Sequence, residues 1–537
     1  MSNPTKKQSF MGGTAILASA VVVVKLIGAV YKIPLNNILG EVGKTYFDTA
    51  YLIYNFLNIL ATAGLPLAIS KLTSQAYVQG RENEKRKIFR TAIWLFLLLG
   101  LAGSGLMFFG SEQLAAFEAN PMAARAIRAL SPAALCVCLL ACMRGYTQGQ
   151  GNMAPTAASQ VLEALCKVGI GLPLAWHVLR LTQDMAGVAA AAIFGVSAGT
   201  ILSVVFLVSY LLTHRSRGRS LDVPSSSGAI LRQVLAIGIP ITLGNSALGI
   251  INLIDTKIVM GRLQSALLLT EVEAAALNGQ YRMAMDMPNM VSSFVYPVTM
   301  SLIPFAAAAI AQRDHAKADR IISSAFRLIA VLAIPAGVGL SVLSTPIMRL
   351  ILPGRQEAAV AAGAHLRILG VATIFICLMI LTNAILQTYG RERVPIFTVV
   401  AGGLTKIVMN FYLVGNPEIG IHGAPVSTLC CYVVVVGLNL LFVWRCSPEK
   451  PRYLAIFLKP ALASALMGGA AWAFYGIASR ALAGHSAYGA NALAVMAGIL
   501  AGVAVYAILV VALRILRAED IKSVPHGAKL VKLLHLR

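Results

Sequence analysis

Charged residues are scarce in this sequence. Asp, Glu, Lys and Arg make up only 12% of its 537 residues, whereas 58% are hydrophobic. Soluble domains carry about 25% charged residues, so the composition excludes a soluble protein of the ordinary kind. Apolar runs of about 20 residues, the length of a membrane-spanning helix, recur along the chain. We therefore predict an all-α polytopic membrane protein.

The sequence also lacks the motifs of common enzymes. It contains no GxxxxGK[ST] phosphate-binding loop. The longest predicted outer loop, about residues 261–282, holds only Glu271 and Glu273 as acidic residues. The cysteines at 136, 138 and 142 have no His or carboxylate at ligand spacing, so they indicate small buried hydrophobic residues. We expect no catalysis, no metal, no bound cofactor and no nucleic-acid partner, despite a net charge of +23.

The apolar runs predict fourteen transmembrane helices in three parts. The parts are an N-terminal lobe at 1–222, a C-terminal lobe at 223–448, and two further spans with a basic tail at 449–537. The predicted spans are 10–33, 47–70, 88–110, 126–147, 155–178, 186–212, 231–255, 283–310, 325–347, 364–388, 395–414, 421–444, 454–478 and 490–515.

An internal repeat relates the first six spans to the next six. The matching positions are Phe89 and Phe326, Arg90 and Arg327, Arg128 and Arg367, Gln148 and Gln387, Gly151 and Gly390, and Lys167 and Lys406. Because each unit has an even number of spans, both have the same orientation in the membrane. The two lobes are then related by an axis along the membrane normal, with a substrate path between them.

Basic residues predict the orientation. With a cytoplasmic N-terminus, most of the 44 Lys and Arg residues fall on inner segments such as 81–90 and 214–219. We therefore expect a multi-pass protein of the bacterial cytoplasmic membrane with both termini in the cytoplasm. The basic loops are explained by topology and by anionic lipid, without a substrate role.

Lys25 lies in an otherwise apolar run from about residue 10 to residue 34. A cation near the centre of a spanning helix costs about 2.5 to 3.5 kcal/mol, so it normally faces a bundle interior or a watery cavity. Lys32 follows seven residues later, about two turns along the same helix face. This face is predicted to form half of a cavity for an anion, although both side chains could instead snorkel to the head groups.

Other polar residues near the spans are further candidates for the site. They are Asn55, Asn58, Asp255, Lys257, Gln280, Arg282 and Asp286. In this topology Lys32, Asp255 and Arg282 lie towards the outer face and could line one vestibule. Asp255 and Arg282 could also simply pair with each other, and Lys257 could lie at the membrane interface.

Two lysines occupy matching positions of the repeat. Lys167 and Lys406 are candidates too, but their matching positions favour a shared packing or inner-face role. Glu163 stands one helical turn before Lys167, so we expect these two to form an i,i+4 ion pair.

Three short segments resemble a known family. They are KLIG at 25–28, AYLIYN at 50–55, and QYR at 280–282 leading to DMP at 286–288. Their order and spacing, with fourteen spans, resemble the multidrug/oligosaccharidyl-lipid/polysaccharide exporter superfamily. Within it, the chain looks like the stage V sporulation protein B branch, which is related to the MurJ lipid II flippases.

The resemblance implies roles for individual residues. Lys25 and Lys32, around Gly28, stand at or one residue from two family arginines, and Arg282 lies near a third. The second-helix arginine of the family falls at Asn58, so that contact is not carried over. Lysine keeps the point charge but loses the bidentate fork of arginine.

The resemblance also implies a site for a coupling cation. An acidic residue of the seventh helix would be Asp255, and Asn383 in the tenth is a further candidate.

These features together predict a monomeric flippase for an undecaprenyl-diphosphate-linked oligosaccharide. Na⁺, H⁺ or the membrane potential would drive it, and envelope-synthesis enzymes are candidate partners. A multidrug antiporter of the same superfamily is the alternative, but it exports mostly cations and needs an acidic cavity. A non-transporting scaffold for envelope or spore-cortex synthesis would need no charged cavity.

Overall fold

The protein is helical throughout the part that the computed structural model describes, which is residues 10–214, 220–448, 450–482 and 486–515. A few side chains inside α1, α9, α10 and α17 also lie outside the description. The predicted basic tail at 516–537 and most of the basic loop at 214–219 lie outside these residues.

The chain forms two compact units. Unit 1 runs to Gly261 and takes in Thr270–Ala276, and unit 2 comprises Arg262–Leu269 and the chain from Leu277 onward. The helices before the boundary are α1 (Phe10–Thr62), α2 (Leu65–Val78), α3 (Glu82–Phe109), α4 (Ser111–Phe117), η1 (Pro121–Ala123), α5 (Ala124–Gly149), α6 (Ala154–Cys166), η2 (Lys167–Gly171), α7 (Leu172–Thr182), α8 (Met185–Thr213) and α9 (Ser227–Ser265).

The helices of the second half complete the fold. They are α10 (Glu271–Ala311), α11 (His315–Val342), α12 (Ser344–Ile351), α13 (Gln356–Thr388), α14 (Arg393–Leu413), η3 (Gly420–His422), α15 (Gly423–Cys446), α16 (Tyr453–Ala481) and α17 (Ala487–Ala512).

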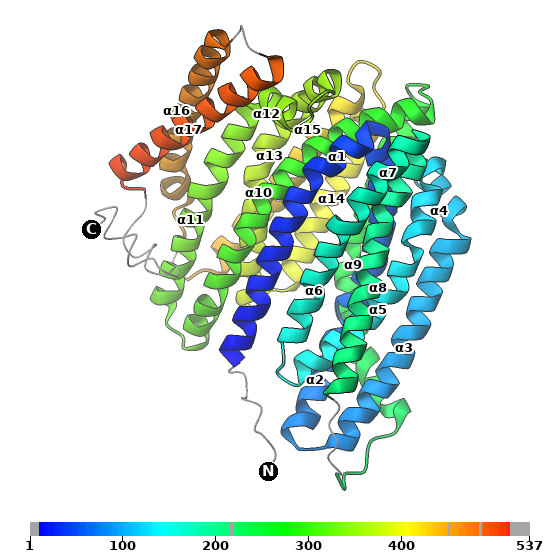
Figure 1. The fold of residues 1–537 in the computed structure, drawn as a ribbon. Helices are drawn as coiled ribbons and strands as arrows, with labels where there is room; N and C mark the ends of the chain where they lie inside the picture. The colour runs from blue at the N-terminus through cyan, green and yellow to red at the C-terminus, as the bar shows by residue number, and fades with distance from the viewer. Residues whose placement is uncertain (1–9, 215–219, 449, 483–485, 516–537) are drawn as a thin grey trace. The chain divides into compact units, whose positions relative to one another are not determined.

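Helix α1 contains the first predicted span, 10–33, and most of the second, 47–70, together with the residues 34–46 that the prediction left between them. The chain stays helical through Pro34, and the bend comes at Gly40, where φ is 61° and ψ is −171°. Figure 1 shows α1 bending sharply at this end. A straight helix of this length would extend about 80 Å, far more than the roughly 30 Å hydrocarbon core of a membrane. The bend divides α1 into a first arm before Gly40 and a second arm after it, and each arm is long enough to cross the membrane.

Eleven stretches of the described residues are long and apolar enough to span a membrane, not the fourteen predicted. Ser19–Val78 counts as one stretch although it includes most of the first predicted span and all of the second. The predicted spans 231–255 and 283–310 lie in α9 and α10, and neither is among the eleven. Only Ser227–Ile239 of α9 stands out, as a shorter apolar helix.

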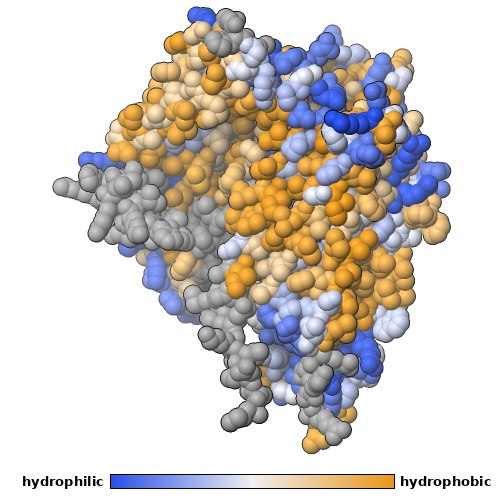
Figure 2. Space-filling model, viewed as in Figure 1, coloured by the Kyte–Doolittle hydropathy of each residue, from blue (hydrophilic) through white to orange (hydrophobic). Residues whose placement is uncertain are grey.

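Unit 1 is organised around α5, which packs against α1, α2, α3 and α8. Helix α8 also packs on α6 and η2, where small residues let the backbones approach closely. A Cβ built on Gly195 would lie 2.5 Å from Cα of Gly171, and one on Gly199 would lie 2.8 Å from the carbonyl oxygen of Glu163. Over unit 1, Figure 2 shows a hydrophobic band along the middle of the helices and hydrophilic side chains near both ends.

In unit 2 the core lies where α11, α13, α15 and α16 meet. Phe326 of α11 is completely buried there. Its ring centroid lies 5.6 Å from that of Tyr453 and 6.1 Å from that of Phe457, both on α16. Figure 1 shows α16 beside α11 and paired with α17.

Matching positions of the repeat share local backbone geometry. Helices α3 and α11 both contain 28 residues, and each is followed at once by a short helix. Gly151 and Gly390, just after α5 and α13, have φ values of 76° and 71°. Glycine accepts this left-handed conformation without strain, which explains why both helices end there.

The segment that follows α8 folds back onto the first turn of α3. The carboxylate of Asp222 accepts hydrogen bonds from the backbone N–H groups of Asn83 at 3.0 Å and Glu84 at 2.9 Å. The side-chain amide of Asn83 donates in return to the carbonyl of Ser220 at 2.8 Å. Asp222 thus satisfies helix N–H groups that would otherwise lack an intrahelical acceptor.

Candidate functional site

The eight predicted site residues are divided between the two units. Lys25, Lys32, Asn55, Asn58 and Asp255 belong to unit 1. Arg282, Asp286 and Asn383 belong to unit 2. The two sets are described separately below.

Lys25 and Lys32 lie on the first arm of α1. The side chain of Lys25 is exposed and that of Lys32 is half-buried. Gly28 lies between them on the same helix face, and a Cβ built on Gly28 would meet no other atom within 4 Å. Both ammonium groups therefore flank a stretch of α1 with free space beside the backbone.

Lys167 lies against two tyrosines of α1. Its Nζ is 5.0 Å from the ring centroid of Tyr31 and 4.8 Å from that of Tyr51. Tyr31 is only 3% exposed. Since a cation above an aromatic face is stabilised by the ring quadrupole, the two rings hold this charge inside unit 1.

The predicted ion pair between Glu163 and Lys167 is wrong. The carboxylate of Glu163 instead accepts a hydrogen bond from Nη2 of Arg144 at 3.2 Å. Nε of Arg144 donates to the Ser159 hydroxyl at 2.9 Å. The α5–α6 contact supplies a guanidinium that can form two hydrogen bonds, and Lys167, one helical turn beyond Glu163, lies against the rings of Tyr31 and Tyr51 instead.

The remaining unit 1 candidates surround α1 and α9. Asn55 and Asn58 are half-buried on the second arm of α1. The side-chain oxygen of Asn58 is buried and accepts no hydrogen bond from the described residues. Asp255 is 7% exposed, whereas the ammonium of Lys257 is exposed and lies 3.9 Å from the ring centroid of Phe117.

In unit 2, Asp286 is 4% exposed and Arg282, one turn earlier in α10, is half-buried. Asn383 of α13 belongs to a buried polar network. Nδ2 of Asn439 donates to Oδ1 of Asn383 at 2.8 Å and to the Thr382 hydroxyl at 3.0 Å. The amide oxygen of Asn383 therefore keeps at most one lone pair for another ligand.

A histidine pair in unit 2 was missed by the sequence analysis. His365 of α13 is 1% exposed, and its ring centroid lies 4.9 Å from that of His422. Neither nitrogen of His365 has a hydrogen-bond partner among the described residues. Nothing in the sequence spacing indicates this contact, because the two residues come from separate helices. Among the described residues, no three His, Cys, Asp or Glu side chains gather closely enough to hold a metal ion.

Family models match most of the membrane-embedded chain. The model of the polysaccharide biosynthesis protein family matches residues 10–309, more than half of the sequence. The chain belongs to this family. A second model, that of the MatE family, matches residues 240–412 of this polysaccharide biosynthesis family member. Both place it among the transporters of the multidrug/oligosaccharidyl-lipid/polysaccharide superfamily, which are not enzymes.

Curated relatives of this family member extend along its whole length. It is 26% identical to the uncharacterized membrane protein YabM of Bacillus subtilis, covering 99% of this chain and 98% of YabM. It is 25% identical to stage V sporulation protein B of the same organism, covering 98% of this chain and 99% of that protein. It is 24% identical to the lipid II flippase MurJ of Bacillus subtilis, covering 81% of this chain and 82% of MurJ.

Solved structures confirm the fold. A lipid II flippase MurJ in an inward-closed conformation is similar with a TM-score of 0.65 and 14% identity, covering 93% of this chain and 99% of MurJ. An inward-facing multidrug resistance transporter of the MATE family is similar with a TM-score of 0.58 and 16% identity, covering 79% of this chain and 98% of that transporter. The family member is therefore an all-helical multi-pass membrane protein with a MurJ-like and MATE-like fold.

Proposed function

We propose that this transporter moves an undecaprenyl-diphosphate-linked oligosaccharide, lipid II or a related envelope precursor, from the inner to the outer leaflet. The observation that carries the proposal is the face of α1 on which Lys25 and Lys32 flank the free space beside Gly28. Two cations beside open space suit a diphosphate, which is a compact anion with several acceptor oxygens. The relative named as a lipid II flippase supports the substrate class.

In the proposed mechanism Lys25, Lys32 and Arg282 bind the diphosphate, while Asn55, Asn58 and Asp286 contribute hydrogen bonds. The two lobes alternate between inward-open and outward-open states, and the polyprenyl tail stays in lipid. Both termini face the cytoplasm. Asp255 and Asn383 contribute oxygen ligands to a coupling Na⁺, or a carboxylate to a coupling H⁺.

The membrane potential would assist the outward step. With a negative cytoplasm, each net negative charge moved outward gains about 2.3 kcal/mol per 100 mV. A diphosphate whose charge is not fully neutralised by Lys25, Lys32 and Arg282 would therefore be driven outward even without an ion gradient.

A flipping assay with the reconstituted full chain tests the proposal. In proteoliposomes loaded with a fluorescent lipid-linked oligosaccharide, K25Q/K32Q should flip at least 10-fold more slowly than the wild type. K71Q, which removes an exposed lysine of α2, should flip normally. Unchanged flipping by a correctly inserted K25Q/K32Q protein would remove the proposed role of both lysines.

The same preparation separates the alternatives. A multidrug antiporter, which the match to the MatE model favours, would transport organic cations and ignore the lipid-linked sugar. A scaffold would transport neither, and photocrosslinking from residue 28 of α1 would capture no lipid-linked substrate. Lysines at the candidate site argue against a cavity built for cations.

A further inference from the structure

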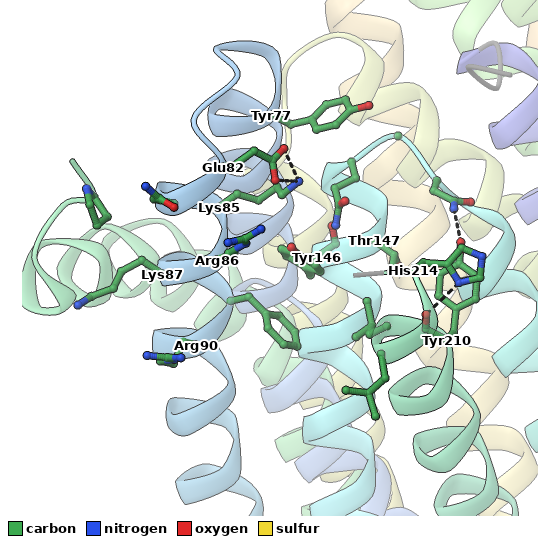
Figure 3. A pocket seen from close by; sticks show the side chains of 18 of the residues that line it. Tyr77, Glu82, Lys85, Arg86, Lys87, Arg90, Tyr146, Thr147, Tyr210 and His214 are labelled. Carbon is green, nitrogen blue, oxygen red and sulfur yellow. Dashed lines mark hydrogen bonds and ion pairs between the residues drawn. The ribbon is translucent and has the colours of Figure 1, made fainter. Parts of the chain in front are cut away.

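Unit 1 contains a cavity of about 1250 Å³ at the end where α3 begins and α5 and α8 finish. Figure 3 shows its walls, which come from α2, α3, α5, α8 and the start of α6, together with the loop after α5 and the segment after α8. The side chains that matter below are Arg86, Phe89 and Arg90 of α3, Tyr146 of α5 and Tyr210 of α8.

The cavity is basic. Four of its lining side chains are Lys or Arg and one is acidic. The acidic residue, Glu82, is already paired with Lys85 at 2.8 Å, so that pair contributes little net charge. Arg86 and Arg90 stand one turn apart on the same face of α3, and like charges at this spacing repel each other. An anion held between the two guanidinium groups would convert this repulsion into two attractive contacts.

The guanidinium of Arg86 lies between α3 and Tyr146, whereas Lys87 extends from another side of the helix (Figure 3). Arg90 is exposed and has no ion-pair partner among the described residues. Arg86 therefore faces the wall formed by α5, and Arg90, one turn further along α3, is exposed to a ligand that arrives from outside unit 1.

An aromatic wall borders the basic face. The ring centroids of Phe89 and Tyr146 lie 4.5 Å apart. The Tyr210 ring stacks on His214 at 4.2 Å, and its hydroxyl accepts a hydrogen bond from Asn152 at 2.8 Å. These contacts keep the wall in place and leave apolar ring surface next to the cations.

The position along α3 matches the membrane interface. After Arg90 the helix becomes apolar, and Trp94, one turn further on, is 61% exposed. Exposed tryptophans concentrate at the level of the lipid head groups. Arg86 and Arg90 therefore lie at the level of phosphate groups, with the apolar surface of α3 continuing towards the acyl chains.

The internal repeat provides a comparison inside the same molecule. At the positions of α11 that match Lys85, Arg86 and Phe89, unit 2 has Ile322, Ser323 and Phe326. There Phe326 is completely covered by Tyr453 and Phe457 of α16. The corresponding Phe89 borders a cavity instead and has cations beside it. Arg90 has a basic counterpart in Arg327, whose guanidinium donates a hydrogen bond to the Ser324 hydroxyl at 3.1 Å. The two faces therefore differ at Lys85 and Arg86 and in the surroundings of the phenylalanine, which is buried in unit 2 and borders a cavity in unit 1.

We propose that this cavity binds the phosphate head group of an anionic phospholipid. Arg86 and Arg90 contact the phosphate oxygens, Tyr146 and Phe89 pack against the glycerol and upper acyl region, and the chains follow the apolar part of α3. Basic pockets between membrane helices are known to hold acidic head groups in this way. The proposal is independent of the transported substrate and stands whether or not the chain is a flippase.

The test uses the purified full chain in a neutral detergent. Thermal midpoints and native mass spectra are recorded with phosphatidylglycerol, with phosphatidylcholine and with inorganic phosphate at equal concentrations. Phosphatidylglycerol should raise the midpoint and remain bound to the protein, whereas the other two should do neither. Equal stabilisation by phosphatidylcholine would overturn the proposal, and an equal shift with inorganic phosphate would assign the cavity to a soluble anion instead.

Substitutions in α3 test whether phosphatidylglycerol binds at Arg86 and Arg90. R86Q/R90Q should weaken apparent phosphatidylglycerol binding about 30-fold, as expected for two surface cations lost near a lipid phosphate. K317Q/R320Q removes two exposed cations from the first turns of the matching helix α11 and should bind like the wild type. R86K/R90K should keep most of the binding. Wild-type affinity in R86Q/R90Q would contradict the site, and if that variant does not fold, the comparison of lipids on the wild type still decides.

Discussion

Arg144 donates a hydrogen bond to Glu163 across 3.2 Å, joining α5 to α6 through a single charged pair. The two side chains are 15% and 28% exposed, so water screens them only in part. Because the pair is surrounded by spanning helices, removing one partner leaves the other charge without its counterion.

We expect E163Q and R144Q each to lower the free energy of unfolding by about 1 to 3 kcal/mol. The double variant R144Q/E163Q should lose less than the sum of both, since no isolated charge remains. Chemical denaturation in detergent, read by tryptophan fluorescence, measures all three. Strict additivity would show that the two groups do not interact.

The contact between Lys167 and the two tyrosines predicts that the stability of the protein depends on the aromatic rings of Tyr31 and Tyr51 and not on their hydroxyl groups. Y31F and Y51F should keep the stability of the wild type, because phenylalanine retains the aromatic face. Y31L/Y51L should destabilise the protein by about 1 to 2 kcal/mol. In a K167M background the same leucine changes should have a smaller effect, and an equal effect would assign the tyrosines to packing alone.

Close packing between α8 and η2 predicts that Gly195 cannot carry a side chain. A Cβ at this position would meet backbone atoms of Gly171, which cannot move aside as a flexible side chain would. G195A should destabilise by about 1 to 3 kcal/mol through overpacking. G169A is the matched control, since nothing lies within 4 Å of a Cβ built there, and it should be neutral or stabilising.

The bond from Asp222 to the start of α3 predicts an effect of pH. Desolvation acts to raise the pKa of Asp222, but hydrogen bonds from Ser220 and from the backbone of Glu84 and Asn83 outweigh it and lower the pKa below 3.8. A depressed folded-state pKa stabilises the native state above the unfolded value and loses this contribution as pH falls through the folded value.

D222A should therefore melt at a lower temperature than the wild type near neutral pH, and the difference should shrink below about pH 4. Differential scanning fluorimetry across this range gives the comparison. D222N, which keeps one acceptor oxygen, should fall between the two at neutral pH. A gap that persists unchanged to low pH would mean that the charge of Asp222 is not what stabilises α3.

The helical membrane fold could be predicted because long apolar runs leave few alternatives. The helices around 88–110 and 126–147 were placed within six residues of α3 and α5. The connection predicted between the first two spans, residues 34–46, contains Gly40, where α1 bends. That the chain stays helical through Pro34 up to this residue was not predicted, because proline breaks helices in water but is tolerated in a membrane helix.

Less of the candidate site than of the fold could be predicted from the sequence. Lys25 and Lys32 stand out because each breaks an apolar run, and their role stays a prediction. The partners of Lys167 could not be found, since Tyr31 and Tyr51 lie far from it in sequence and meet it only through packing. The local i,i+4 rule favoured Glu163, and the tertiary contact of Glu163 with Arg144 overrode that rule.

Gly40 joins the two arms of α1 without any loop. Its dihedral angles lie in a region that only glycine occupies readily, so every other residue type would strain the joint. An articulation of one residue has no slack to absorb motion. A change in the angle between the arm that bears Lys25 and the arm that bears Asn58 would therefore have to come from the two backbone rotations of Gly40.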